Sequence, residues 1–219
     1  MTSGPAPDWL RRLVADAPRM RVHRGLRPPA DGGRPSAVLI LFGSGPSGPD
    51  LLLIQRSSTL RNHAGQPAFP GGALDPEDGD PNGEGPVRAA LREAAEETGL
   101  DPAGVDVLDT LPDLFVWRSG FRVTPVVGWW RAPSEVGPGD PAEVASVARV
   151  PIEDLADPAN RASVRGPSGY VGPAFLVADM VVWGFTAGII EALLDLGGWD
   201  RPWDRSRMVD LPGPYGRPA

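Results

Sequence analysis

Three glutamates stand within five residues near the middle of the chain, at positions Glu93, Glu96 and Glu97. The surrounding segment predicts a helix, because Pro86 suits a first helical turn and Gly99 suits a C-terminal cap. At 100° per residue, the three glutamates share one face of this helix. The opposite face is predicted to carry Val87, Leu91, Ala94 and Thr98.

This spacing of like charges suggests a metal site. Carboxylates at i, i+3 and i+4 destabilise a helix by about 0.2–0.5 kcal/mol per pair, so something should offset their repulsion. A hard divalent cation such as Mg²⁺ does so directly, since it prefers oxygen ligands and leaves positions for water and phosphate groups. For three glutamates on an arbitrary helix, a solvated acidic face is the plain alternative.

The fixed residues around the glutamates form a longer pattern, Glu-x7-Arg-Glu-U-x-Glu-Glu-x-Gly-U, where U is apolar. Six such identities arise by chance at only ~10⁻⁸ of positions. The pattern resembles the Nudix box and is carried by Glu84, Arg92, Glu93, Ala94, Glu96, Glu97, Gly99 and Leu100. One departure concerns the glycine that normally stands six residues before the first glutamate, where this chain has Asp78. The candidate is Gly72, which leaves eleven intervening residues and predicts an extended loop before Glu84.

A second resemblance narrows the family. Residues 52–72 read LLIQRSSTLRNHAGQPAFPGG and resemble the coenzyme A pyrophosphatase branch, with Ile54 standing where that branch usually has Thr. Residues 183–187, WGFTA, resemble a segment near the end of the same branch. The resemblance covers roughly residues 36–196 in the expected order.

The resemblance implies both a fold and a reaction. The fold is the α/β Nudix sandwich, an α/β/α arrangement with a mixed β-sheet between helices. The reaction is the hydrolysis of the pyrophosphate bond of coenzyme A, or a derivative, to adenosine 3′,5′-bisphosphate and 4′-phosphopantetheine or its acyl form.

The resemblance also assigns expected roles to individual residues. Mg²⁺ or Mn²⁺ is the expected cofactor, with the metal ligands Glu93, Glu97, Glu96 and the Gly72 carbonyl. Arg92 is expected to pair with carboxylates of the box, and the general base is Glu93 or Glu143. The expected substrate-binding residues are Arg56, Arg61, Gly71 and Phe69, although core packing is an alternative role for Phe69.

Two other functions stay open. The chain could hydrolyse another nucleoside diphosphate derivative, such as NADH or ADP-ribose. It could also be a catalytically silent Nudix domain that serves as a ligand-binding scaffold, although the complete glutamate set argues against this. The family is consistent with a homodimer.

Apolar runs predict the elements that must position these residues. Strands are expected at 37–42, 51–54, 105–116, 121–130, 143–150 and 177–182, and helices at 85–98 and 185–196. The predicted organisation is an N-terminal helix and Pro/Gly-rich arm (1–35), a Nudix domain (36–200) and a mobile tail (201–219).

Composition excludes several classes of function. The chain has 219 residues with 28 acidic and 21 basic side chains, an acidic balance that argues against a nucleic-acid partner. It lacks cysteine and lysine, which excludes disulfides, thiolate ligands, Schiff bases and a P-loop lysine. The start does not resemble a secretory signal, and the apolar run 171–190 contains Asp179 and Pro173. We therefore expect a cytoplasmic protein without a membrane span.

Overall fold

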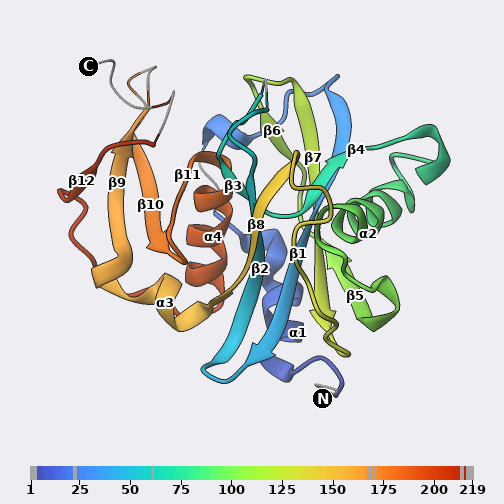
Figure 1. The fold of residues 1–219 in the computed structure, drawn as a ribbon, viewed down its shortest axis with the longest axis horizontal. Helices are drawn as coiled ribbons and strands as arrows, with labels where there is room; N and C mark the ends of the chain where they lie inside the picture. Colours follow the sequence, from blue (N-terminus) through green and yellow to red (C-terminus); the bar gives the residue numbers. More distant parts are fainter. Residues whose placement is uncertain are drawn as a thin grey trace.

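The structure is a computed structural model that describes residues 4–21, 24–60, 62–166, 169, 171–212 and 215. Within these residues, eight strands form one mixed sheet (Figure 1). They are β1 (Arg34–Gly45), β2 (Gly48–Arg56), β3 (Pro67–Ala68), β4 (Gly71–Ala73), β5 (Val105–Thr110), β6 (Leu114–Val116), β7 (Phe121–Trp130) and β8 (Val144–Pro151).

Strand β1 organises this sheet. It pairs parallel with β7 along its length and antiparallel with β2 and β4 at its two ends. Its apolar run is buried almost continuously, as expected for a strand covered on both faces. The main strand order is β3-β2-β1-β7-β5. Outside this order, β4, the short strand that follows Pro70, pairs with the start of β1.

Helices cover both faces of the large sheet. Helix α2 (Gly85–Thr98) packs on one face against β1, β4 and β7. Helices α1 (Asp8–Asp16) and α4 (Gly184–Leu196) contribute to the core on the other face. The predicted α/β fold with a mixed sheet between helices is therefore confirmed.

A smaller sheet lies beyond α4 (Figure 1). In the described part of the chain it has four strands in the order β11-β10-β9-β12. Their bounds are β9 (Arg161–Arg165), β10 (Val171–Val177), β11 (Met180–Trp183) and β12 (Met208–Val209), and a short helix α3 (Ile152–Ala156) leads into the sheet.

Two segments that the sequence predicts as one continuous strand each are interrupted in the structure. The run 177–182 is not one strand, because the chain turns at Ala178 and Asp179, both with positive φ, and continues antiparallel as β11. The run 105–116 is divided into β5 and β6, with Pro112 in the break. Proline cannot donate a ladder hydrogen bond, and this explains the interruption.

Both terminal segments join the domain where the structure describes them. Trp9 of α1 makes edge-on ring contacts with Phe42, Trp129 and Trp199. In the segment expected to be a mobile tail, β12 pairs parallel with β9, and Leu211 is buried.

None of the helices in the described residues is long and apolar enough to cross a bilayer.

We predict that Leu10→Ala lowers the free energy of unfolding by about 2–5 kcal/mol, because it leaves a cavity in the main core. Leu10 is fully buried within α1. Urea denaturation would measure the loss, with Val171→Ala as a control because Val171 is 46% exposed. A loss no larger than that of the control would show that α1 is separable from the domain.

Candidate active site

The face of α2 that meets the sheet carries three small residues. Ala89, Ala90 and Ala94 are fully buried there, and their size allows the helix backbone to approach the strands closely. Glu97 lies on this same face and is only 6% exposed. The predicted placement of Glu97 on a face opposite Ala94 and Thr98 is therefore wrong, because the alanines rather than the larger aliphatic residues define the buried side.

Gly71 and Gly72, the glycine pair at the start of β4, lie next to the Glu97 carboxylate. The Gly71 N–H donates to Glu97 Oε2 at 2.9 Å, and Arg56 Nη1 donates to Oε1 at 3.3 Å. Gly71 has φ +155°, and a Cβ at this position would lie 2.3 Å from the Ala37 carbonyl oxygen. Only glycine therefore brings the backbone N–H to this carboxylate.

Burial dominates the electrostatics of Glu97. It raises the pKa of the carboxyl to about 7, against the lowering effect of the Gly71 N–H and of Arg56. The nearby charges of Glu93 and Glu143 raise this pKa further. The positive groups in place therefore do not fully compensate the burial of the charge.

Glu93 lies on the other side of the glycine pair. A methyl group on Gly72 would come within 2.5 Å of Glu93 Oε1, so the carboxylate rests directly against the strand backbone. Burial raises the pKa of Glu93, while its hydrogen bond to Arg92 lowers it. The structure thus brings Glu93, Glu97 and Gly72 together, whereas the side chain of Glu96 is 61% exposed.

Arg92 neutralises the outer part of this cluster. Its Nη1 contacts Glu93 at 2.9 Å and Glu96 at 3.3 Å. Its Nε and Nη2 form a two-point contact with Asp78 at 3.2 and 2.9 Å. A fork of this kind fixes the orientation of the guanidinium and, through it, the rotamers of the two glutamates.

Asp78 is a site residue that the sequence reasoning did not identify. It ends the 3₁₀ turn η3 (Pro76–Asp78) and forms a reciprocal capping box with Asp75. Its side chain is 5% exposed, and Arg92 lowers its pKa. Glu84, in contrast, is exposed and pairs with Arg88 at 2.7 Å.

The extra residues of the box therefore fall after its first acidic residue. Asp78 stands six residues after Gly72, the spacing expected from the box glycine to its first acid. The sequence predicts that the inserted residues lie between Gly72 and a functional Glu84. The pairing of Arg92 with Asp78 corrects this prediction, because Asp78 and not Glu84 contacts the box arginine. Counting forward from Gly72, rather than back from Arg92, would have identified Asp78.

The loop at 131–143 closes the C-terminal end of α2. Its Gly137 and Gly139 N–H groups donate to the carbonyls of Thr98 and Glu97, each at 3.0 Å. These bonds satisfy orphan carbonyls at the helix end. The loop ends at Glu143, whose carbonyl accepts from the Ser57 N–H at 2.8 Å and whose exposed side chain lies near enough to raise the pKa of Glu97.

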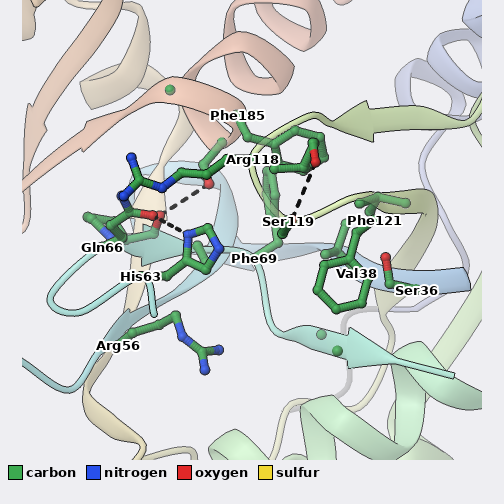
Figure 2. Close-up of a pocket in the computed structure, with 18 of the residues that line it drawn as sticks. Ser36, Val38, Arg56, His63, Gln66, Phe69, Arg118, Ser119, Phe121 and Phe185 are labelled. Carbon is green, nitrogen blue, oxygen red and sulfur yellow. Dashed lines mark hydrogen bonds between the residues drawn. The ribbon is translucent and has the colours of Figure 1, made fainter. Parts of the chain in front are cut away.

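A cavity of about 550 Å³ opens beside the glycine pair (Figure 2). Arg56, His63 and Phe69 line it, and Phe69 also packs in the core with 2% exposure. His63 Nδ1 hydrogen-bonds Gln66 Oε1 at 2.8 Å. Arg61, the other expected phosphate ligand, lies outside the described residues.

The two segments that resemble the coenzyme A pyrophosphatase branch meet at this cavity. Thr186 Oγ1, at the start of α4, donates to the Pro67 carbonyl at 3.1 Å. Trp183 and Phe185 line the same cavity as the glycine pair. The hydrogen bond therefore fastens the N-terminal end of α4 to the strand that precedes the glycines.

The donor set fits a hard cation in its chemistry. As the described side chains are placed, no three carboxylates or imidazoles converge closely enough to hold a metal ion. Arg92, Gly71 and Arg56 instead bond the oxygens of Glu93 and Glu97. The charge of Glu93 nevertheless adds to burial in raising the pKa of Glu97, and carboxylate oxygens are the ligands that Mg²⁺ prefers.

Comparison with known proteins identifies the family. Residues 33–168 match the NUDIX domain. The chain is a member of the Nudix family. It is 39% identical to the uncharacterized Nudix hydrolase NudL of Citrobacter koseri over 77% of this chain and 87% of that protein. NudL of Escherichia coli strain K12 is 40% identical over 73% of this chain and 81% of the relative.

A solved Nudix fold agrees with this assignment. RenU, a Nudix hydrolase from M. Smegmatis, matches with a TM-score of 0.52 and 21% identity over 80% of this chain and 92% of that one. The chain thus belongs to a family of hydrolases that act on pyrophosphate bonds and generally use divalent metal ions such as Mg²⁺ or Mn²⁺.

We predict that Glu97→Gln stabilises the metal-free protein at pH 8 by up to about 3 kcal/mol, since a pKa raised from 4.5 to about 7 disfavours the charged form by that order. Below pH 4.5 the carboxyl is protonated in both folded and unfolded states, so the two proteins should converge. The difference should grow as pH rises from 4.5 to 7.

Urea denaturation in chelator at several pH values measures this difference. Glu96→Gln is the matched control, because the exposed Glu96 side chain loses little hydration on folding. A Glu97→Gln protein that is equally stable at pH 4 and pH 8 relative to the wild type would contradict the burial argument.

Proposed function

We propose that this Nudix hydrolase cleaves the pyrophosphate bond of coenzyme A or its derivatives, giving adenosine 3′,5′-bisphosphate and 4′-phosphopantetheine or its acyl form. One observation carries the proposal. The two segments that resemble the coenzyme A pyrophosphatase branch, residues 52–72 and 183–187, both line one cavity, and its lining residues Arg56 and Gly71 hydrogen-bond the buried Glu97. Thr186 joins them by its hydrogen bond to Pro67.

The charges of the site suit a diphosphate. Arg56 is 28% exposed, lines the cavity and faces Glu97, so it can bind a phosphate oxygen without moving far. Its Nε is buried and has no hydrogen-bond partner among the described residues. Guanidinium groups bind phosphate oxygens through two parallel hydrogen bonds, so an arginine at this position suits an anionic ligand.

The proposed metal ligands are Glu93, Glu97 and Glu96 with the Gly72 carbonyl. When bound, Mg²⁺ or Mn²⁺ polarises the phosphoryl oxygens and lowers the pKa of a bound water. Arg92 holds the rotamers of Glu93 and Glu96, while Gly71 orients Glu97 through its N–H. These contacts limit the reorganisation that the carboxylates need.

The remaining roles concern the proton and the substrate. Glu143 or Glu93 accepts the proton of the attacking water. Glu143 lies near Glu97 because it ends the loop that caps α2. Arg56 and Arg61 bind phosphate oxygens. Phe69 and Gly71 form the wall against which the substrate lies.

We predict that Glu97→Gln lowers kcat by at least two orders of magnitude while the fold survives. Glu84→Gln serves as the matched control, because Glu84 is exposed and bonded only to Arg88 at 2.7 Å among its described contacts. Steady-state kinetics with Mg²⁺ and with Mn²⁺ would measure both. Near-normal turnover by Glu97→Gln would remove this residue from the metal site.

Product analysis tests the substrate. Mass spectrometry after hydrolysis of coenzyme A in ¹⁸O-labelled water should show the two expected products, with the label marking the phosphorus attacked. NADH, ADP-ribose and acyl-CoA run in parallel. A far higher kcat/KM for ADP-ribose would replace the coenzyme A assignment, and no turnover of any substrate with either metal would favour a silent scaffold.

A further inference from the structure

A second chamber of about 310 Å³ adjoins the main cavity at the end of the β6–β7 turn. His63, Arg118, Ser119 and Phe121 line both spaces, so the two chambers share a wall. Arg34 lines only the second chamber, together with Asn62. Nearly all of its polar side chains can donate hydrogen bonds.

The charge of this region departs from that of the chain. The protein has a formal net charge of −7 with 28 acidic side chains. Yet no Asp or Glu is among the described residues that line either chamber. Within the described residues, neither Arg34 nor Arg118 forms an ion pair, whereas Arg92, Arg122 and Arg149 are all paired with carboxylates.

Backbone hydrogen bonds position the chain at these two arginines, and both residues are exposed. Arg34 starts β1 opposite Phe121 in the parallel β1–β7 pairing, and its N–H donates to the Gly120 carbonyl at 2.9 Å. Its guanidinium lies over the Phe121 ring, 4.9 Å from the ring centre. Arg118 stands in the turn closed by the Ser119 N–H and the Val116 carbonyl. Arg34 at the start of β1 and Arg118 in the turn before β7 therefore lie at neighbouring strand ends.

His63 contributes an imidazole ring to the wall that the two chambers share. Its backbone has φ +57°, and its Nδ1 is bonded to Gln66, so the ring orientation is set. Its Nε2 has no hydrogen-bond partner in the described part of the chain. In the view of Figure 2 the imidazole lies between the guanidinium groups of Arg118 and Arg56.

We propose that this second chamber binds a phosphomonoester of the nucleotide substrate, separate from the diphosphate at the glycine pair. Two guanidinium groups that form no ion pair within the described residues, together with amide and hydroxyl donors, match a dianionic phosphate. The inference rests on the proposed function and extends it, because coenzyme A carries a 3′-phosphate that ADP-ribose and NADH lack. The chamber then selects substrates by that phosphate.

Matched substrate pairs test the selection. Wild-type protein should hydrolyse coenzyme A with a kcat/KM at least tenfold above that of dephospho-coenzyme A, which has the same diphosphate. Arg118→Ala and Arg34→Ala should each lower this ratio about tenfold, through a higher KM for coenzyme A. Arg12→Ala, an exposed position on α1, is the charge-matched control and should keep the wild-type ratio. NADPH and NADH form a second pair that tests a 2′-phosphate as the source.

A binding measurement separates this inference from the catalytic proposal. In chelator, calorimetry should show that wild-type protein binds adenosine 3′,5′-bisphosphate at least tenfold more tightly than adenosine monophosphate. Arg118→Ala should abolish the difference, and Arg118→Lys should restore part of it. If coenzyme A is not hydrolysed but this difference persists, the chamber stands and the substrate assignment fails. Equal binding of both nucleotides by the wild type, with no phosphate preference in either substrate pair, would overturn the chamber.

Discussion

A single buried carboxylate constrains the architecture around it. Glu97 sits where α2 meets β4, held by the Gly71 N–H and by Arg56. A charge in that position requires an alanine face on the helix and a glycine pair on the strand, since larger residues would hold the two backbones apart. The raised pKa of Glu97 shows that burial outweighs the compensation in place. The fold therefore maintains an unfavourable charge at a position suited to a cation.

Arg92 explains how the outer glutamates are tolerated. It connects Glu93 and Glu96 to the buried Asp78, so the repulsion along α2 is balanced by one guanidinium fork. Because Asp78 is fixed by its capping box with Asp75, the chain after it can lengthen without moving the fork. The free-energy cost of a longer surface loop grows slowly with its length, which is why the extension in the box is harmless at this point.

Local spacing allowed α2, β1 and β7 to be predicted, because the helix caps and apolar runs lie within each segment. The buried face of α2 was not predictable in the same way. Hydrophobic periodicity favours Val87 and Leu91, which the structure places against the core, but it does not identify Ala89 and Ala90 as the fully buried positions. It also treats Glu97 as a surface residue, whereas the close approach of the helix to glycine buries it. The division at Ala178 and Asp179 was missed because the apolar run continues through a turn that local composition barely marks.

The rest of the site depends on pairing between strands that are distant in sequence, and local sequence patterns do not predict such pairing. Arg34 and Arg118 are far apart along the chain, and only the parallel alignment of β1 with β7 brings them to one chamber. A separate antiparallel pairing places β4, with its glycine pair, beside β1. Carboxylates thus gather on α2 beside the glycines, whereas the cavity walls carry arginines and, among the described residues, no Asp or Glu. Such a separation of charge orients a polyanionic ligand, because its phosphates favour the arginine walls while the carboxylates admit them only together with a cation.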